Sequence, residues 1–368
     1  MKRVRKCLVV ALASAGVVLA SAGSASAAQL LYATDGAGGN VSNLYILNPD
    51  TGAVVKTVGP VGFAVTGLAI DPTTGTLYGS TGRQASAGQP NPGSLIKIDR
   101  TTGKGTLIGD ERANTETAAD ITFTPDGALF GWLEDTTDDL VTINTATGAA
   151  TVVGDSGLDT YGSGIASNSA GVLYFAGEGE QGRLFTIDRS TGGATPIATL
   201  NGPNGDPGIS SLAFDASGTL FGSRIPSDSP NFGSDLITLN TGTGAITSKG
   251  PSVDRLDGIA FVPPRTATLK KKLKNGGEKV RLFGQIADTG DPACLADQPV
   301  KVQRLRLGAA KSARKKKKKF KTFRTLRTDR VGRFSTKAKV NQSFKYRAFL
   351  PESTVCDDAT SKAKKVKA

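Results

Sequence analysis

Histidine is absent from the 368-residue chain, and this absence restricts the chemistry available to it. Neither a Ser-His-Asp nor a Cys-His nucleophile can be built, and a His-ligated catalytic zinc site is excluded as well. Tryptophan and methionine occur once each, and cysteine occurs three times. After residue 28 no apolar run reaches the ~20 residues of a membrane-spanning helix. The sequence therefore predicts neither histidine-dependent catalysis nor a transmembrane segment.

Residues 1–28 have the order of an export signal. Several basic residues near the start precede an apolar run at 7–20, and small residues fill positions 24–28. This order predicts a cleavable signal peptide. We therefore expect a secreted, extracellular protein that is released or held non-covalently at the cell surface.

Two cysteines, Cys294 and Cys356, remain after the signal is removed, because Cys7 lies within it. An even pair in an exported protein predicts one disulfide. The alternative is a pair of unbridged buried thiols. A disulfide that closes a loop of this length stabilises a fold by about 4 kcal/mol on the chain-entropy model.

Charge divides the chain at Pro263-Pro264. Residues 265–368 contain 30 Lys and Arg against 8 Asp and Glu, a net charge of +22. Residues 29–264 carry a net charge of −13, so the whole-chain value of +13 conceals two regions of opposite sign. Two successive prolines cannot donate to a sheet ladder and make a stiff boundary. We expect two domains, residues 29–264 and residues 265–368.

One turn pattern recurs five times between residues 30 and 264. An apolar strand ends in Asn or Asp, two variable residues follow, and Thr-Gly closes the turn. The Asx side chain accepts from a backbone N–H two residues on, and glycine supplies a positive φ, so the pattern predicts hairpins. The copies run from Asn48 to Gly52, Asp99 to Gly103, Asn144 to Gly148, Asp188 to Gly192 and Asn240 to Gly244.

Each hairpin is followed by an alternating apolar strand, and these strands begin at residues 68, 121, 165, 212 and 259. Their spacing of 53, 44, 47 and 47 residues is the period of a four-stranded propeller blade. A Leu-aromatic strand follows four of the copies, and its fifth copy, Leu31-Tyr32, lies at the other end of the region. We therefore expect an all-β fold with a five-bladed β-propeller, closed by pairing of its N- and C-terminal strands.

The motifs of the first repeat are Gly-Leu-Ala-Ile-Asp-Pro at 67–72, Gly-Thr-Leu-Tyr at 75–78 and Ile-Asp-Arg-Thr-Thr-Gly at 98–103. They resemble the repeats of exported bacterial propellers of the lactonase-like and WD-repeat-like class, and the likeness covers residues 29–264. It implies a fold but no particular function, because that class includes enzymes and binding scaffolds. It also implies that the Gly-Leu-Ala strand is innermost, so that the loops before it rim a central channel.

Alignment of the repeats places seven candidate binding residues at the mouth of this channel. They are Glu116, Asp120, Tyr161, Ser163, Ser210, Arg255 and Asp257. A Ca²⁺ ion takes six to eight oxygen ligands, and Asp120 and Asp257 are the acids of the rim itself. We therefore interpret them as solvated loop acids and predict no metal and no cofactor.

The enzymatic alternative is a carboxylate-dependent glycosidase or a lactonase-like hydrolase. A glycosidase needs two acids at a defined separation, but no acidic pair occupies matching inner-strand positions in these repeats. Residues 154–157, Gly-Asp-Ser-Gly, are similar to a serine-hydrolase signature, yet the chain has no base to activate Ser156. We interpret this segment as a turn and predict no catalytic residue.

Residues 265–368 alternate apolar and polar positions in short stretches between turn signals, which indicates a small β-sandwich. Residues 300–304, followed by Thr328-Asp329 and Gly332-Arg333-Phe334, are similar to the Ig-like and carboxypeptidase-regulatory-like modules of exported actinobacterial proteins. The likeness implies a basic, non-catalytic Ig-like module.

A dense cationic run lies between two predicted strands of this module. It comprises Lys311, Arg314, Lys315, Lys316, Lys317, Lys318, Lys319 and Lys321. The run is either a solvated hairpin tip or a contact for a polyanion such as teichoic acid, acidic polysaccharide, anionic lipid or DNA. A third alternative is that the acidic propeller docks on it.

From these features we expect a non-enzymatic binding or scaffold protein. Its acidic propeller would present a surface to a protein or glycan ligand. Its basic sandwich would associate with an anionic polymer of the cell surface.

Overall fold

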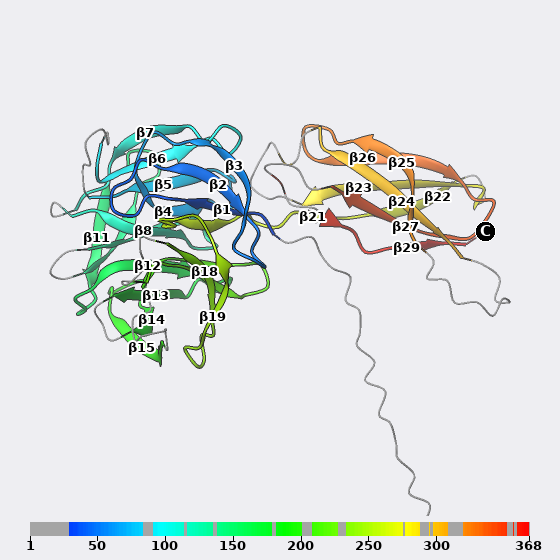
Figure 1. Cartoon of the computed structure of the whole chain (residues 1–368). Helices are drawn as coiled ribbons and strands as arrows, with labels where there is room; N and C mark the ends of the chain where they lie inside the picture. Colours follow the sequence, from blue (N-terminus) through cyan, green and yellow to red (C-terminus); the bar gives the residue numbers. More distant parts are fainter. Residues whose placement is uncertain are drawn as a thin grey trace, which may run out of the picture.

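The structure is a computed structural model of the whole chain, and its regular elements are strands throughout. It describes residues 29–83, 91–113, 116–134, 138–178, 182–200, 208–226, 233–274, 277–287, 294, 297–307, 319–351, 356 and 359–367. The predicted signal peptide, residues 1–28, lies outside this set. The predicted all-β class is confirmed. Two bodies are joined by the segment between β20 (Ile259–Phe261) and β21 (Thr266–Ala267) (Figure 1).

The first region consists of four-stranded antiparallel sheets, and in four of them the strands lie side by side in chain order. These strands are β4 (Val65–Ile70), β5 (Leu77–Thr81), β6 (Ser94–Ile98), β7 (Gly105–Asp110); β8 (Ala118–Phe123), β9 (Leu129–Leu133), β10 (Asp139–Ile143), β11 (Ala150–Asp155); β12 (Tyr161–Ser167), β13 (Leu173–Glu178), β14 (Arg183–Ile187), β15 (Ala194–Thr199); and β16 (Ile209–Phe214), β17 (Leu220–Arg224), β18 (Asp235–Leu239), β19 (Ile246–Pro251).

A fifth sheet of the described residues joins the two ends of this region. Its order is β20, β1 (Leu31–Thr34), β2 (Asn43–Leu47) and β3 (Val54–Pro60). Strand β1 pairs antiparallel with β20, so that Tyr32 lies opposite Ala260. The N-terminal strand therefore completes the sheet of the last repeat.

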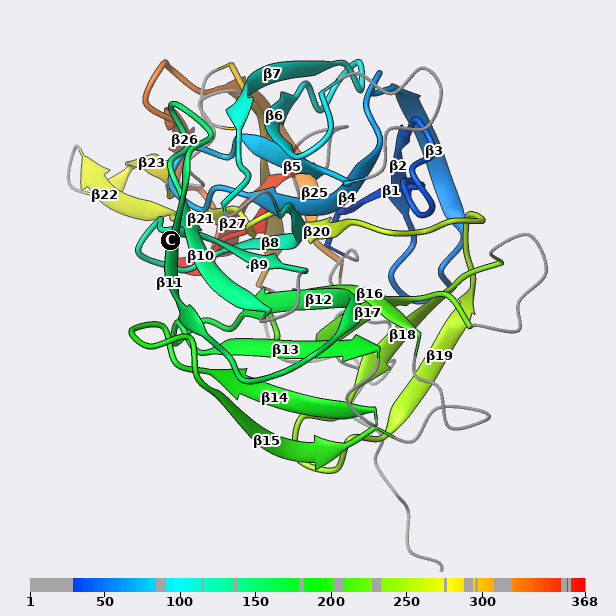
Figure 2. The same ribbon diagram turned by 90° about the vertical axis from the view of Figure 1, so that its left-hand side faces the viewer.

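The sheets are grouped about one axis. Their first strands β4, β8, β12, β16 and β20 contact each other in turn, and β20 also contacts β4. The fourth strands β3, β7, β11, β15 and β19 lie at the periphery (Figure 2). Burial follows this order, because β4 is buried along nearly its whole length whereas β3 is mostly exposed.

The predicted hairpin chemistry is present in each of the five turns. In the first, Asn48 Oδ1 accepts from the Asp50 N–H at 2.8 Å, and Gly52 has a φ of 72°. The equivalent Asx bonds are made by Asp99, Asn144, Asp188 and Asn240. The local sequence therefore determines the turn between the third and fourth strand of every sheet.

The second region has two sheets. In one, β23 (Lys279–Ala287) pairs with β21, β22 (Lys270–Lys274) and β26 (Arg333–Lys339). In the other, β24 (Pro299–Arg306) lies between β25 (Lys321–Arg327) and β27 (Phe344–Leu350), and β27 also pairs with β28 (Ala359–Thr360) and β29 (Lys364–Val366).

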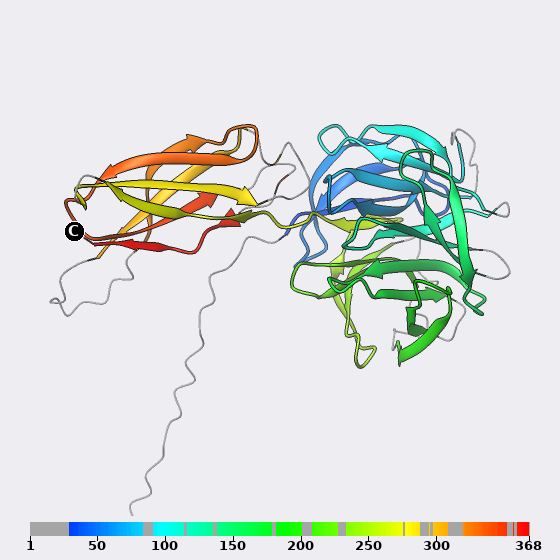
Figure 3. The ribbon, with the colours of Figure 1, turned by 180° about the vertical axis from the view of Figure 1, so that it is seen from behind.

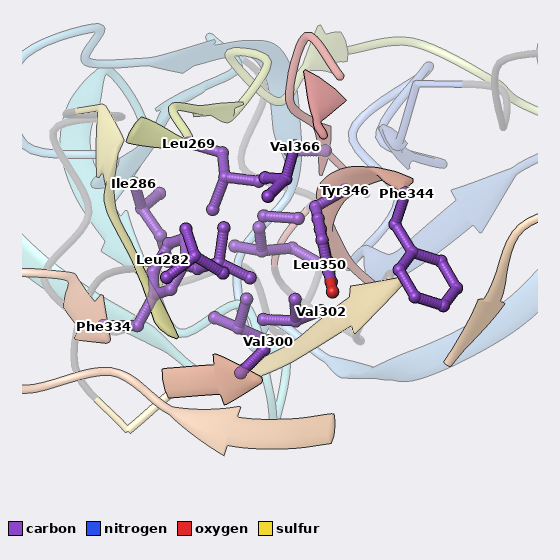
Figure 4. Close-up of a cluster of buried hydrophobic side chains, with 14 residues drawn as sticks. Leu269, Leu282, Ile286, Val300, Val302, Phe334, Phe344, Tyr346, Leu350 and Val366 are labelled. Carbon is purple, nitrogen blue, oxygen red and sulfur yellow. The ribbon is translucent and has the colours of Figure 1, made fainter. Parts of the chain in front are cut away.

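The two sheets share one hydrophobic core. Leu282 and Phe334 come from one sheet and Val302 and Tyr346 from the other, and all four are buried in the same cluster (Figure 4). The buried Cys294 and Cys356 of this region are joined by a disulfide. The predicted pairing of these cysteines is thus confirmed.

Candidate functional site

Asp120 lies among the inner strands and not at an open channel mouth. Its side chain is fully buried, and its Oδ1 accepts from the Ile121 N–H at 2.9 Å. Its Oδ2 accepts from the N–H groups of Ile165 in β12 at 3.0 Å and of Leu212 in β16 at 3.2 Å. The expectation of a solvated rim acid is therefore wrong for Asp120. This carboxyl group holds strands of three different sheets together.

The geometry of the inner strands explains this arrangement. One edge of each inner strand faces the axis, where no further strand is available to accept its N–H groups, and a buried N–H needs a partner. Asp120 supplies acceptors for β12 and β16. Ser211 supplies the next one, because its Oγ accepts from the Ile259 N–H at 3.2 Å and so connects β16 to β20.

Glycines let the inner strands approach one another at this level of the axis. A Cβ atom on Gly67 would lie 2.7 Å from Asp120 Cα, and one on Gly164 would lie 2.7 Å from the Ser211 carbonyl carbon. Side chains larger than hydrogen are excluded at these two positions. Adjacent to this level is a cavity of about 100 Å³ lined by all five inner strands.

Burial dominates the electrostatics of Asp120. Desolvation raises the pKa of Asp120 well above its usual range, and the hydrogen bonds from Ile165 and Leu212 act in the opposite direction. Both oxygens already serve as acceptors for backbone N–H groups. Asp120 therefore acts as a structural residue of the axis.

Two predicted serine sites make separate contacts. The Ser163 Oγ donates to Glu134 Oε1 at 3.1 Å. The Ser210 Oγ lies 3.4 Å from the Ser223 Oγ. The side chain of Tyr161, a third predicted residue, lies outside the described set.

The contacts of the predicted charged residues of the rim come from several parts of the propeller. Glu116 Oε2 lies 3.5 Å from a guanidinium nitrogen of Arg83. Arg255 has a φ of 61° and donates from Nη1 to the Ala37 carbonyl at 3.0 Å. Asp257 is buried, and so it is not the solvated loop acid that we expected. Its backbone packs against β1, with its N–H 2.9 Å from the Thr34 carbonyl oxygen.

Sequence reasoning also missed the burial of Glu111. Its side chain is fully buried beside Ser80, whose hydroxyl donates to Glu111 Oε1. Burial raises the pKa of Glu111 to about 8, and the bond from Ser80 opposes this shift. The equivalent positions after the fourth strand of the other sheets hold Val61, Ser156, Leu200 and Ser252, so Glu111 is the one acid at this position of the repeat.

The predicted anion-binding run falls mostly outside the described residues. Lys319 and Lys321 are described and exposed, whereas Lys311 and 314–318 lie outside the set. Within the described ranges, no three Asp, Glu or Cys side chains gather into a group that would hold a metal ion.

Comparisons with known proteins locate a repeat in the first region. A family model described as a repeat of unknown function (DUF6923) matches residues 15–166. No curated protein matches the sequence. Across the described residues, no helix is both long and apolar enough to cross a membrane.

Several solved structures are similar to this chain at low identity. A chain of the nidogen/laminin complex has 16% identity and a TM-score of 0.41, over 63% of this chain and 97% of that one. TolB from Acinetobacter baumannii has 14% identity and a TM-score of 0.39, over 71% of this chain and 62% of that one. Regucalcin from Agrobacterium tumefaciens, described as a calcium-binding protein, has 16% identity and a TM-score of 0.32, over 66% of this chain and 74% of that one.

Repetition is present in both the structure and the sequence of the first region. The same hairpin and inner strand recur in sheets grouped about one axis. The matching family model also describes a repeat. This chain is a β-propeller repeat protein.

Proposed function

We propose that this chain is an exported, non-enzymatic binding protein that a basic domain retains on anionic polymers of the cell surface. Residues 1–28 act as the signal peptide. Residues 29–264 form a five-bladed propeller closed through β1 and β20, and residues 265–368 form an Ig-like sandwich. The rim of the propeller, with Glu116, Ser163, Ser210, Arg255 and Tyr161, presents a surface to a protein or glycan ligand.

The uncompensated positive charge of the second region carries this proposal. Its 30 cationic residues face 8 acidic ones in the same region. The ion pair between Arg327 and Asp297 spans 2.8 Å, yet both side chains are more than 60% exposed, so it contributes little. A surplus of this size attracts polyanions over a distance of about 10 Å at 0.1 M salt.

The buried state of Asp120 supports a binding role over hydrolysis by an acid on the axis. Its two oxygens accept N–H groups from three strands and do not face solvent. A general base must reach the proton that it abstracts. Asp120 therefore contributes to the scaffold that positions the surface loops.

Sedimentation with isolated cell walls tests the proposal. The mature chain, residues 29–368, is mixed with walls that are either intact or stripped of their anionic polymers. We expect it to sediment with the intact walls, to stay in solution with the stripped ones, and to be released by salt. Equal sedimentation with both preparations would contradict retention through polyanions. A chain that stays in solution with both would favour docking of its own acidic propeller on the basic region.

A further inference from the structure

One face of the second region is mainly cationic. In the sheet β22–β23–β26, Val280, Leu282 and Thr336 are buried, so the alternate positions point away from the core. Eight of the eleven outward positions whose side chains are described on these three strands are Lys or Arg. They are Lys270, Lys272, Lys274, Lys279, Arg281, Arg333, Lys337 and Lys339.

The strand register sets these cations directly beside one another. Lys272, Arg281 and Lys337 form one row across the sheet, because Lys272 pairs with Arg281 and Arg281 pairs with Lys337. Lys274, Lys279 and Lys339 form the next row. Neighbouring strands are about 4.8 Å apart, and outward positions along a strand are about 7 Å apart.

Such rows destabilise a sheet, since like charges opposite each other on adjacent strands repel. None of the eight cations forms an ion pair with a carboxylate of the described residues. Asp329 lies in the turn before β26, and its Oδ1 already accepts the backbone N–H groups of Val331 and Arg333. Within the described part of the chain, therefore, no ion pair offsets this repulsion. Asp329 lies close to the face, since it lines the same groove as Arg333.

A groove runs over one end of this cationic face. It has a volume of about 390 Å³, and its lining includes Lys270, Arg281 and Arg333 together with Phe283 and Gln285. The Arg281 guanidinium lies 5.4 Å from the centre of the Phe283 ring. The strands β22 and β23 that carry much of this face run side by side along the second region (Figure 3).

The outward face of the other sheet, which contains β24 and β27, is not mainly cationic. Its outward positions on β24 and β27 are Pro299, Lys301, Gln303, Leu305, Lys345, Arg347 and Phe349. Across the described strands β25, β24, β27 and β29, no outward row holds three cations. Lys345 lies between Lys365 and Leu305, and Lys301 lies between Thr325 and Phe349. The concentration of charge is therefore specific to one sheet of the two.

We propose that the outward face of β22–β23–β26 binds a flexible, linear, base-free polyanion such as a poly(glycerol phosphate) chain. This inference rests on the proposed function and names the surface and the ligand class for it. Six of the eight cations are Lys, which act as point charges and suit a ligand with a mobile backbone. Binders of single-stranded nucleic acid add aromatic stacking platforms, whereas the outward positions here hold one aromatic, Phe283, already covered by Arg281.

Charge-matched variants of the mature chain test the surface. The face variant combines Lys272→Gln, Arg281→Gln and Lys337→Gln, and the control combines Lys301→Gln, Lys345→Gln and Lys365→Gln on the other sheet. Affinity for long-chain inorganic polyphosphate is measured at about 0.1 M salt, with circular dichroism to verify folding. We expect the face variant to bind about tenfold more weakly and the control to change less than about threefold.

The remaining outcomes would contradict the assigned face, the ligand class or the proposed function. Equal losses in both variants would mean that net charge alone drives binding, and the assigned face would be wrong. A loss confined to a third variant, with 315–319 changed to Ser, would leave the proposed function standing and reject this face. Tighter binding to an oligo-dT with the same number of phosphates would reject a base-free ligand. No binding of the unmodified chain to either probe would reject the proposed function itself.

Discussion

The Asp120 carboxylate accepts a hydrogen bond from the Ile165 N–H, with Asp120 Oδ2 3.0 Å from the Ile165 nitrogen, and so joins β8 to β12. The same oxygen reaches Leu212 in β16. At the axis, β8, β12 and β16 have no further strand to accept their N–H groups. The Asp120 side chain accepts these hydrogen bonds instead. We therefore expect the stability of the folded propeller to depend on the Asp120 carboxyl group. The positions of the surface loops depend in turn on the folded propeller.

Removal of the Asp120 carboxylate tests this dependence. In Asp120→Ala the N–H groups of Ile165 and Leu212 lose their acceptor, and each unsatisfied buried donor costs about 1–3 kcal/mol. We expect the free energy of unfolding to fall by about 2–6 kcal/mol, and by less in Asp120→Asn, which keeps one acceptor. Denaturant unfolding followed by Trp132 fluorescence measures it. The exposed substitution Asp50→Asn should change it by under about 0.5 kcal/mol, and an equally small effect of Asp120→Ala would refute the role of Asp120.

Glu111 makes the stability of the propeller depend on pH. Its pKa is about 8 in the folded chain and 4.5 as the reference value, so the folded state holds the proton over this interval while the unfolded state has lost it. Stability from this group is therefore greatest below pH 4.5 and is lost as the pH rises to 8. Relative to Glu111→Gln, the unmodified chain should lose about 3 kcal/mol between about pH 5 and pH 8. Parallel pH profiles for the two proteins would disprove the shift.

Reduction of the disulfide should destabilise the second region and spare the first. Cys294 and Cys356 are 62 residues apart, and opening a loop of this size costs about 4 kcal/mol on the chain-entropy model. Trp132 is the one tryptophan of the chain and lies in β9, so its fluorescence reports on the propeller. We expect a reductant to shift a far-UV circular dichroism transition and to leave the fluorescence transition in place. Simultaneous movement of both signals would contradict separate domains.

Closure of the propeller is tested by a cross-link between its end strands. Ala33 lies opposite Ile259 in the pairing of β1 with β20. The double variant Ala33→Cys, Ile259→Cys should form a second disulfide, because opposed residues of an antiparallel pair are within reach of one. Mass spectrometry of the unreduced protein identifies the linked peptides, and Ala33→Cys alone should keep a free thiol. Two free thiols in the double variant would argue against closure.

The hairpins and inner strands were predictable because their information is local. The Asx residue, the Thr-Gly pair and the positive φ at Gly52 lie within five residues of one another. The repeat count left one strand missing and so pointed to Leu31-Tyr32; in the structure Leu31 lies opposite Phe261. Period and turn chemistry together therefore determine the order of strands.

The burial of Asp120 and Glu111 was not predictable in the same way. Asp120 occupies a position that in neighbouring repeats holds Gly67 and Gly164, and the sequence alone does not reveal that these positions meet at the axis. The positions equivalent to Glu111 hold Val61, Ser156, Leu200 and Ser252 in the other repeats, and none of these is acidic. Both acids are exceptions to their repeat, and comparison of repeats position by position is the signal that would have found them.

The cationic face of β22–β23–β26 was not predictable from the sequence for a different reason. Residues 270–274 read Lys-Lys-Lys-Leu-Lys, a run that shows no alternation. Only the pairing of Lys272 with Arg281 fixes which of its side chains share a face. The cations of this face are spread over three separate segments of the chain, whereas the run at 311–321 is continuous and therefore more conspicuous in the sequence.

The most direct test of the central claim is the affinity of the mature chain for a linear polyanion over a salt series. Each phosphate that a Lys or Arg of the protein neutralises on a flexible single chain contributes about −0.7 to the slope of log affinity against log salt concentration. With at least about five cations of the face engaged, we predict a straight line with a slope of about −3.5 or steeper. A flat line, with affinity independent of salt, would contradict retention of this protein through its basic domain.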